Sequence, residues 1–298
     1  MWVRASSRLT ESTWQITTAV SSHLFVNAEK SALVDSSIAA ISAELIDAVN
    51  EHLGPDRELD YILISHVHFD HVGSLVALRE AFPSAKMIAS RQSANIISEE
   101  AVRTELFERN REASRALGRN FDFSRDIWDA ALEADEIVRD GDVLELGNGV
   151  IVKLIECPGH TVDSLVYYVY PDEVFAGSEA LGGYAGKGKY LWSFYSSYES
   201  YLNSIERLSS LAAKAVVFPH NGSLTGDMAR RYFFELSASV KKFAEDVRQS
   251  IANGEVREEI VQRLFVEWKA QGIAPDGPFI PPLEENLRAM VSLILESP

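Results

Sequence analysis

Short apolar runs that end in polar clusters recur along the chain. Runs of this kind, rich in Val, Ile and Leu and bounded by Gly, Pro or Ser, are typical of β-strands. Five of them stand out: Ser31–Asp35, Tyr61–Ser65, Val150–Glu156, Glu173–Ala176 and Ala215–Phe218. Between them, the apolar positions of Val72–Phe82 and Tyr198–Leu211 have the spacing of amphipathic helices. Strands mixed with helices predict a layered α/β domain.

Two further stretches differ from this alternation. Glu99–Gly118 is charged, helical in pattern and poor in Gly and Pro, and it predicts a helical insert at about residues 99–130. From Asp227 to the end the pattern is helical, except for the Pro-rich stretch Gly272–Pro282. We therefore expect an α/β domain over residues 1–224 and a helical C-terminal region over residues 225–298 that packs over the functional site.

The composition is that of a globular protein, with 46% hydrophobic and 24% charged residues. The 28 Lys and Arg against 44 Asp and Glu give a net charge of −16, which disfavours nucleic acid as a partner. Cys157 is the only cysteine, so no disulfide can form within the chain. No apolar run approaches the roughly 18 residues of a membrane-spanning helix, and the first residues lack the apolar core of a signal peptide. We expect a cytoplasmic protein with neither a nucleic-acid nor a membrane partner.

The strongest chemical pattern is the hexapeptide HVHFDH at residues 66–71. His66 and His68 point to one side of an extended backbone, because side chains alternate along it. Asp70 and His71 follow at the predicted start of a helix and approach from a second direction. The hexapeptide can therefore offer two ligands to each of two adjacent metals, and imidazole with carboxylate suits Zn, Fe, Mn or Co.

The remaining histidines are of two kinds. His160 and His220 closely follow strand-like runs, as the hexapeptide does. Residues just past strand ends gather at one edge of a layered sheet protein, so we expect both side chains to complete the coordination of the two metals. Turn residues without a ligand function are the alternative. His23 and His52 lack partners in the sequence and are predicted to be structural.

The segments HVHFDH, PGHT and PHNG, in this order, resemble motifs of the metallo-β-lactamase superfamily. The resemblance covers roughly residues 15–225 and implies an αββα sandwich with a dinuclear metal site at one edge of the sheets. Carried over by position, it implies two sets of ligands. One metal would be bound by His66, His68 and His160, and the other by Asp70, His71 and His220.

The sequence departs from this family where a carboxylate usually bridges the two metals. The family has Asp after Gly at the end of the strand that here reads EVFAG, whereas this chain has Ser178 and then Glu179. Counting along the strand places Ser178 at the bridging position, and counting back from the following ALG places Glu179 there. A carboxylate neutralises paired cations better than a hydroxyl, so we predict Glu179 as the ligand and Ser178 beside it.

A narrower resemblance involves the later segments. The run SEALGGY…YESYLNSIERL, the predicted insert and the helical C-terminus are similar to the PqsE-type thioesterases of the superfamily. This resemblance implies a hydrolase of acyl thioesters or esters with a helical cap over its site.

Two divalent transition metals, Zn, Fe or Mn, would supply a bridging hydroxide near neutral pH. Asp70 is the predicted catalytic residue, because it would orient this nucleophile as well as bind a metal. Asp35 ends another predicted strand and is a candidate partner for a ligand histidine. The aromatic residues after Glu179 predict a wall of the substrate pocket, with ordinary packing as the alternative: Tyr184, Tyr190, Trp192 and Tyr195.

The sequence thus favours a dinuclear metal-dependent hydrolase that acts on a small acyl thioester or carboxylic ester. A di-iron oxidoreductase is one alternative. A binding or regulatory module with a vestigial metal site is another, supported mainly by the unusual Ser178 and Glu179. The pattern leaves the substrate, the metal and a homodimeric state open.

Overall fold

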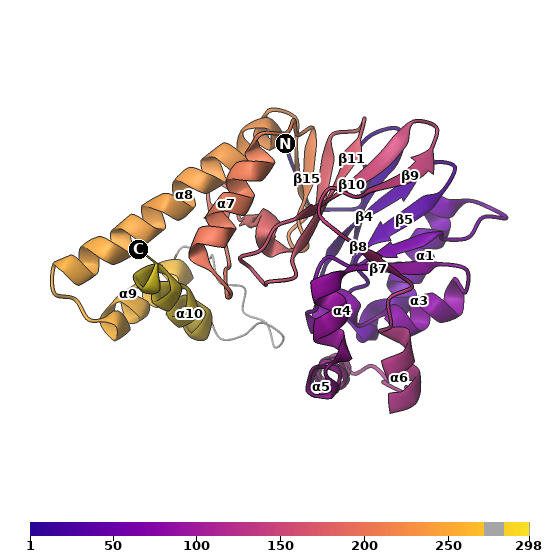
Figure 1. The fold of residues 1–298 in the computed structure, drawn as a ribbon, viewed down its shortest axis with the longest axis horizontal. Helices are drawn as coiled ribbons and strands as arrows, with labels where there is room; N and C mark the ends of the chain where they lie inside the picture. Colours follow the sequence, from indigo (N-terminus) through magenta and orange to yellow (C-terminus); the bar gives the residue numbers. More distant parts are fainter. Residues whose placement is uncertain (271–282, 298) are drawn as a thin grey trace.

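The structure is a computed structural model and describes residues 1–270 and 283–297. Two seven-stranded sheets form its centre (Figure 1). The first contains, in spatial order, β1 (Trp2–Val3), β16 (Ser223–Thr225), β15 (Ala215–Val217), β12 (Val174–Gly177), β11 (Leu165–Tyr170), β10 (Val150–Glu156) and β9 (Val143–Gly147). The second contains β2 (Ser7–Arg8), β3 (Thr13–Thr17), β4 (Ser22–Asn27), β5 (Ser31–Val34), β6 (Tyr61–Leu63), β7 (Lys86–Ser90) and β8 (Glu136–Val138).

Helices cover the outer face of each sheet. The second sheet packs against α1 (Ser42–Leu53), α3 (Leu75–Ala81) and α6 (Arg125–Ala131). The first sheet packs against α7 (Tyr198–Ser209) and α8 (Asp227–Ala252). The layers therefore run helix, sheet, sheet, helix, which confirms the predicted αββα sandwich (Figure 1).

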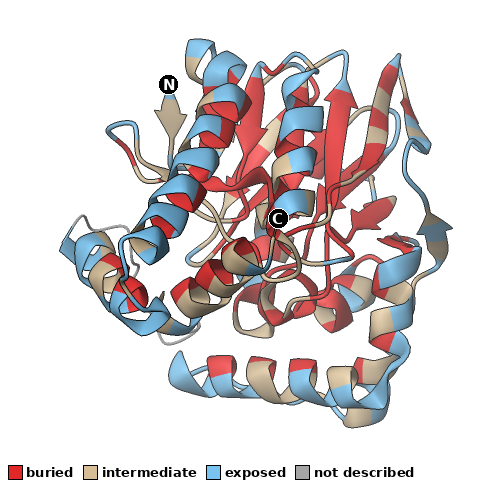
Figure 2. Ribbon diagram, turned by 60° about the vertical axis from the view of Figure 1, so that its left-hand side comes forward, coloured by how far each residue is buried: buried red, intermediate tan, exposed pale blue. Residues whose placement is uncertain are grey.

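A third apolar core fills the space between the two sheets. It combines side chains such as Leu24 and Leu63 from the second sheet with Leu154 and Tyr167 from the first. Figure 2 shows the result, with buried strands at the centre and helices whose outer faces are exposed. Each sheet thus has both faces covered, and its strand ends and their loops remain as the places for polar chemistry.

All five predicted strands are present, but one predicted helix is interrupted. The helix expected over Val72–Phe82 is present as α3, which begins only at Leu75, and Gly73 and Ser74 separate it from the short helix α2 (Phe69–Val72). A Cβ atom at Gly73 would lie 2.2 Å from Oδ1 of Asn110 and 2.8 Å from the backbone nitrogen of Ala39. The chain passes so close to these groups that a side chain larger than that of glycine would collide with them at position 73.

The predicted insert and C-terminal region are helical in the structure. The insert contains α5 (Glu100–Ala116), which follows α4 (Arg91–Ser98), and the C-terminal region continues from α8 into α9 (Arg257–Ala270) and α10 (Leu283–Glu296). The predicted break at Gly272–Pro282 lies entirely within residues 271–282, outside the described residues. None of the helices in the described ranges combines the length and apolar character needed to cross a membrane.

Candidate metal centre

Five strands bring the predicted site residues to one edge of the sandwich. Asp35 follows β5, the hexapeptide follows β6, and His160 follows β10. Glu179 lies in the short helix η2 (Glu179–Leu181) after β12, and His220 follows β15. Two groups result, in each of which the potential ligand atoms lie within 4.8 Å of one another. The first group is His66, His68 and His160, and the second is Asp70, His71, Glu179 and His220.

The first group consists of three imidazoles that face one another. Nε2 of His66 lies 2.8 Å from Nδ1 of His68, and Nε2 of His160 lies 3.3 Å from the same Nδ1 atom. The rings of His66 and His160 are buried. These three histidines form a tri-histidine group. Three imidazole nitrogens at such separations can hold a divalent metal and leave a coordination position for a further ligand.

Glu179 lies between the two groups and uses one carboxylate oxygen for each. Its Oε1 is 3.3 Å from Nε2 of His71 and 3.3 Å from Nε2 of His220. Its Oε2 is 3.4 Å from Nε2 of His66 and 3.3 Å from Nε2 of His160. The carboxylate therefore lies within reach of both groups of potential ligands.

Ser178 has a different role in the structure. Its side chain is fully buried, and its hydroxyl oxygen accepts a hydrogen bond of 3.1 Å from the backbone N–H of Ala180. The serine therefore caps the first turn of η2, and the carboxylate of the next residue projects into the cluster. Of the two positions that the sequence left open, the structure places Glu179 between the groups.

Hydrogen bonds fix the rings of four histidines. Nδ1 of His71 bonds to Oδ2 of Asp35 at 2.9 Å, and Nδ1 of His66 to the hydroxyl of Ser65 at 3.0 Å. The Ser65 hydroxyl donates in turn to Oδ2 of Asp35 at 2.8 Å. Asp35 therefore orients one ring directly and a second through Ser65.

The two remaining rings bond to backbone carbonyls. Nδ1 of His160 donates to the carbonyl of Ser193 at 3.0 Å, and Nδ1 of His220 to the carbonyl of Val20 at 2.9 Å. A proton on Nδ1 leaves the lone pair of Nε2 free, and in both residues Nε2 is the atom that faces the cluster.

The protonation of the two groups differs. Burial holds the pKa of His66 well below its usual value, and the neighbouring His71 and His68 lower it further. Burial also lowers the pKa of His68, to about 4, and that of His160. The tri-histidine group is therefore neutral at pH 7, which is the form that binds metal.

In the second group, opposite charges overcome the effect of burial. Burial would lower the pKa of His71, but the carboxylates of Glu179, Asp35 and Asp70 hold it well above its usual value. Hydrogen bonds to Asp70 and Glu179 likewise raise the pKa of His220 to about 10. Burial would raise the pKa of both carboxylates, yet the adjacent imidazoles, His71 foremost, hold it low. Without metal, this group carries protons that a cation would displace.

The donor set suits two divalent transition metals. Oε2 of Glu179 is buried and has no hydrogen-bond partner in the part of the chain that the structure describes, although it points between His66 and His160. An ionised oxygen buried in this way is costly unless a cation compensates it. Imidazole nitrogens with two carboxylates match Zn, Fe or Mn, so the residues fit the metals that the sequence predicts.

The four predicted pocket aromatics separate in the structure. The ring of Tyr195 lies 5.2 Å from that of His160, beside the cluster. Tyr190 packs against Tyr232 of α8, and Trp192 against Phe243 of α8 and Trp268 of α9. The fourth, Tyr184, packs against Tyr190 and Trp2. The pocket role of these residues stays a prediction, with Tyr195 alone among the four in ring contact with a cluster histidine.

Sequence reasoning did not find two residues that support the cluster. Ser65 directly precedes the hexapeptide, and a hydroxyl beside a ligand histidine was the available signal. Asp163 is 4% exposed and bonds to the backbone of Val67 between His66 and His68. The sequence around Asp163 did not predict these contacts, because its partners Ser93 and Val67 are about 70 and 96 residues away along the chain.

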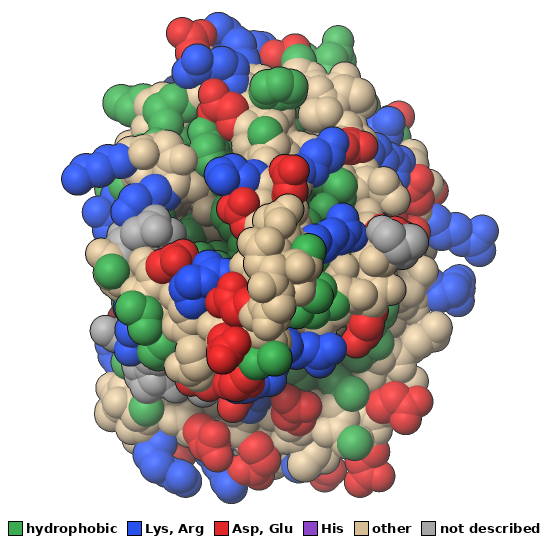
Figure 3. All heavy atoms as spheres, turned by 90° about the vertical axis from the view of Figure 1, so that its left-hand side faces the viewer, with side chains coloured by type: hydrophobic (Ala, Val, Ile, Leu, Met, Phe, Trp, Pro, Cys, Tyr) green, Lys and Arg blue, Asp and Glu red, His purple; other side chains and the backbone are tan. Residues whose placement is uncertain are grey.

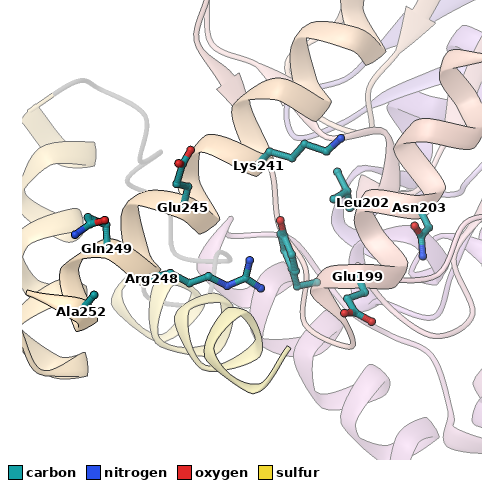
Figure 4. Close-up of a pocket in the computed structure, with 9 residues that line it drawn as sticks. Glu199, Leu202, Asn203, Lys241, Glu245, Arg248, Gln249 and Ala252 are labelled. Carbon is teal, nitrogen blue, oxygen red and sulfur yellow. The ribbon is translucent and has the colours of Figure 1, made fainter. Parts of the chain in front are cut away.

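A surface groove of about 760 Å³ lies between α7 and α8, apart from the cluster residues (Figure 4). Its walls carry Lys241 and Arg248 together with Glu199 and Glu245, so opposite charges balance. Acidic and basic side chains are also interspersed over the face formed by the C-terminal helices (Figure 3).

The fold and the paired groups define an αββα protein with a candidate two-metal centre. The family model of the metallo-beta-lactamase superfamily matches residues 16–220, which is more than half of the chain, and the chain belongs to this superfamily.

Three similar proteins illustrate the range of the family. The metallo-beta-lactamase fold-containing protein ST1585 of Sulfurisphaera tokodaii is 24% identical over 218 residues, covering 72% of this chain and 78% of its own. Its crystal structure superposes with a TM-score of 0.54 at 17% identity, covering 100% of this chain and 98% of the other. A stereoselective inverting sec-alkylsulfatase from Pseudomonas gives a TM-score of 0.65 at 14% identity, covering 97% of this chain and 50% of that enzyme. These structural likenesses show the shared fold.

The third is an anaerobic nitric oxide reductase flavorubredoxin of Salmonella arizonae. It is 24% identical over 158 residues, which cover 53% of this chain and 27% of that protein. The chain thus matches about a quarter of the flavorubredoxin's length.

Proposed function

We propose that this protein is a dinuclear metal-dependent hydrolase that acts on a small acyl thioester or carboxylic ester. The observation that carries the proposal is the position of Glu179, whose two oxygens face the two histidine groups at 3.3–3.4 Å. One carboxylate facing two sets of ligands is the arrangement of a two-metal centre.

In this proposal, His66, His68 and His160 hold one metal, and Asp70, His71 and His220 hold the other, with Glu179 shared. Two metals bound there would generate a nucleophile from water near neutral pH and polarise a carbonyl group. Asp70 is the proposed catalytic residue. Its Oδ2 accepts from His220 at 3.3 Å and its side chain is 22% exposed, so it can accept a hydrogen bond from the nucleophile.

Two arguments support an ester or thioester as the substrate: the chemistry of the leaving group and the residues that surround the cluster. A thiolate leaves readily, because the pKa of a thiol is near 8.5, so the site needs no strong general acid. Tyr195 offers an aromatic surface beside His160, and the helical insert and C-terminal region fit the resemblance to PqsE-type thioesterases. A cytoplasmic location, and a substrate that is neither nucleic acid nor membrane, belong to the same proposal.

A di-iron oxidoreductase is the second candidate. The similarity to flavorubredoxins, which covers 53% of this chain, supports it. The two candidates differ in the metal that the site holds and in the reaction that follows its loading.

The deciding experiment measures metal content and turnover together. The protein is purified without a histidine tag, its metals are counted by plasma mass spectrometry, and it is assayed with acyl thioesters and p-nitrophenyl esters after loading with Zn, Mn or Fe. We expect two metals per chain and hydrolysis that a chelator abolishes. Two irons with oxidoreductase activity and no hydrolysis would establish the second candidate. A chain that binds no metal under any loading would point to a binding or regulatory module.

A further inference from the structure

The tri-histidine group combines residues that follow strands of both sheets. His66 and His68 follow β6 of the second sheet, whereas His160 follows β10 of the first. The two sheets are separate hydrogen-bonded units, so sheet hydrogen bonding alone does not set the distance between His160 and the other two rings. Contacts between the loops must set it.

Asp163 provides such a contact at the centre of the group. It lies in the loop between β10 and β11, three residues after His160, and it is 4% exposed. Its Oδ2 accepts a hydrogen bond of 2.9 Å from the backbone N–H of Val67. Val67 stands between His66 and His68, so this bond ties the loop of one ligand to the backbone between the two others.

The same oxygen is itself held in place. The hydroxyl of Ser93, in α4, donates to it at 2.8 Å. Two neighbouring bonds also join the sheets, from the backbone N–H of Leu165 to the carbonyl of Ser65 at 2.7 Å and from the hydroxyl of Tyr167 to the carbonyl of Ile64 at 2.8 Å. These bonds end before the hexapeptide, whereas the bond from Asp163 reaches into it.

A buried carboxylate is costly to desolvate, and a neutral side chain would serve ordinary packing better. We propose that Asp163 is a positioning residue for the tri-histidine group: its hydrogen bond to Val67 sets the separation of His160 from His66 and His68, and hence the affinity of that group for a divalent metal. The inference rests on the proposed function, because it takes this group as a metal site. Groups that orient ligands typically contribute about 10–100-fold to metal affinity.

The test measures Zn²⁺ affinity by competition with a chromophoric chelator, on the full chain and without an activity assay. A His220→Ala background weakens the second group, so that the remaining tight binding reports the tri-histidine group. In this background, Asp163→Ala is expected to weaken Zn²⁺ binding about 10–100-fold. Asp163→Asn keeps an acceptor of the same length and is expected to stay within about threefold of the parent.

Two further variants distinguish a loss of positioning from a failure to fold and from a general loss of stability. Asp163→Glu keeps the charge but displaces the acceptor, and it is expected to lose affinity like the alanine variant. Asp172→Ala is the matched control, because this carboxylate accepts hydrogen bonds from the hydroxyls of Thr10 and Ser12 away from the cluster. It should lower thermal stability and leave Zn²⁺ affinity unchanged.

The outcomes separate the inference from the proposed function. If the alanine and glutamate variants bind Zn²⁺ as tightly as the parent, Asp163 does not position the group and the inference fails. If the asparagine variant loses as much affinity as the alanine variant, the charge acts and the hydrogen bond does not, which also overturns it. If the unmodified chain binds no metal at all, the proposed function fails first.

Discussion

Ser178 and Glu179 are adjacent in the chain and face different partners. The Ser178 hydroxyl accepts the N–H of Ala180 at 3.1 Å inside the protein, and the Glu179 carboxylate lies among four imidazoles. The hydroxyl of Tyr201 donates to the carbonyl of Glu179 at 3.2 Å and supports the same turn. The carboxylate thereby lies between the two groups, although Glu179 stands one place later in the chain than the family's usual Asp.

Substitutions at these two positions should separate metal binding from stability. Glu179→Ala removes the shared carboxylate, so the protein is expected to hold about one metal per chain instead of two. Ser178→Ala removes only the cap of η2 and should cost about 1 kcal/mol of stability while both metals are retained. Metal content by mass spectrometry and thermal denaturation check both. Full metal loading of Glu179→Ala would contradict the bridging position.

His68→Ala is expected to abolish metal loading of the first group and turnover together. The variant leaves two imidazoles where the structure brings three within ligand distance. His52→Ala is the matched control, because His52 packs against Trp14 and Phe25 with ring separations of about 6 Å, outside the cluster. Unchanged hydrolysis by His68→Ala, measured with the ester that the unmodified protein hydrolyses, would refute the proposed mechanism.

Asp35→Asn should weaken metal binding about 10–100-fold, because Asp35 accepts from both His71 and Ser65. Asn also tolerates the left-handed backbone that Asp35 adopts, at φ 61°. The control is Asp60→Asn. Asp60 accepts hydrogen bonds from the backbone N–H and the hydroxyl of Ser31, the first residue of β5, which Asp35 follows. Chelator competition measures the affinities, and equal values for the two variants would argue against the orienting role of Asp35.

Metal binding to the second group should release protons, and binding to the first should not. The pKa of His71 is held well above its usual value and that of His220 is raised to about 10, so both are protonated in the metal-free protein at pH 7.5. The affinity of this group is therefore expected to rise about tenfold per pH unit for each proton displaced. Calorimetry in buffers of different ionisation enthalpy counts the protons. Proton release on metal binding to the tri-histidine group, and none on binding to the second group, would contradict these protonation states.

His23 should make the protein less stable in mild acid. Burial lowers its pKa from 6.5 to about 4 in the folded state. The unfolded chain therefore binds more protons between these values, and folding stability falls as pH drops from 6.5 to 4, by about 2 kcal/mol at pH 5. Denaturant titrations of the metal-free protein and of His23→Gln, at pH 7.5 and 5, test this. The loss between the two pH values should be smaller in the variant, and an equal loss would refute it.

Local patterns were sufficient for the strands and for the hexapeptide. Alternation places His66 and His68 on one side of an extended segment, and the short helix that begins at Phe69 carries Asp70 and His71. These properties depend on neighbours in sequence. The close approach of Gly73 to Asn110 and Ala39 could not be predicted in this way, because these two residues lie in distant segments of the chain.

The sequence by itself determined the layered α/β architecture and the order of potential ligand types along the chain, because hydrophobic period and residue spacing are local. Only the tertiary structure decided which of Ser178 and Glu179 faces the cluster, that Asp163 reaches Val67, and that Tyr195 lies beside His160. The contact between Asp163 and Val67 depends on how the two sheets pack face to face. The packing brings together loops that lie about 100 residues apart in sequence, and no local pattern in the chain encodes that distance.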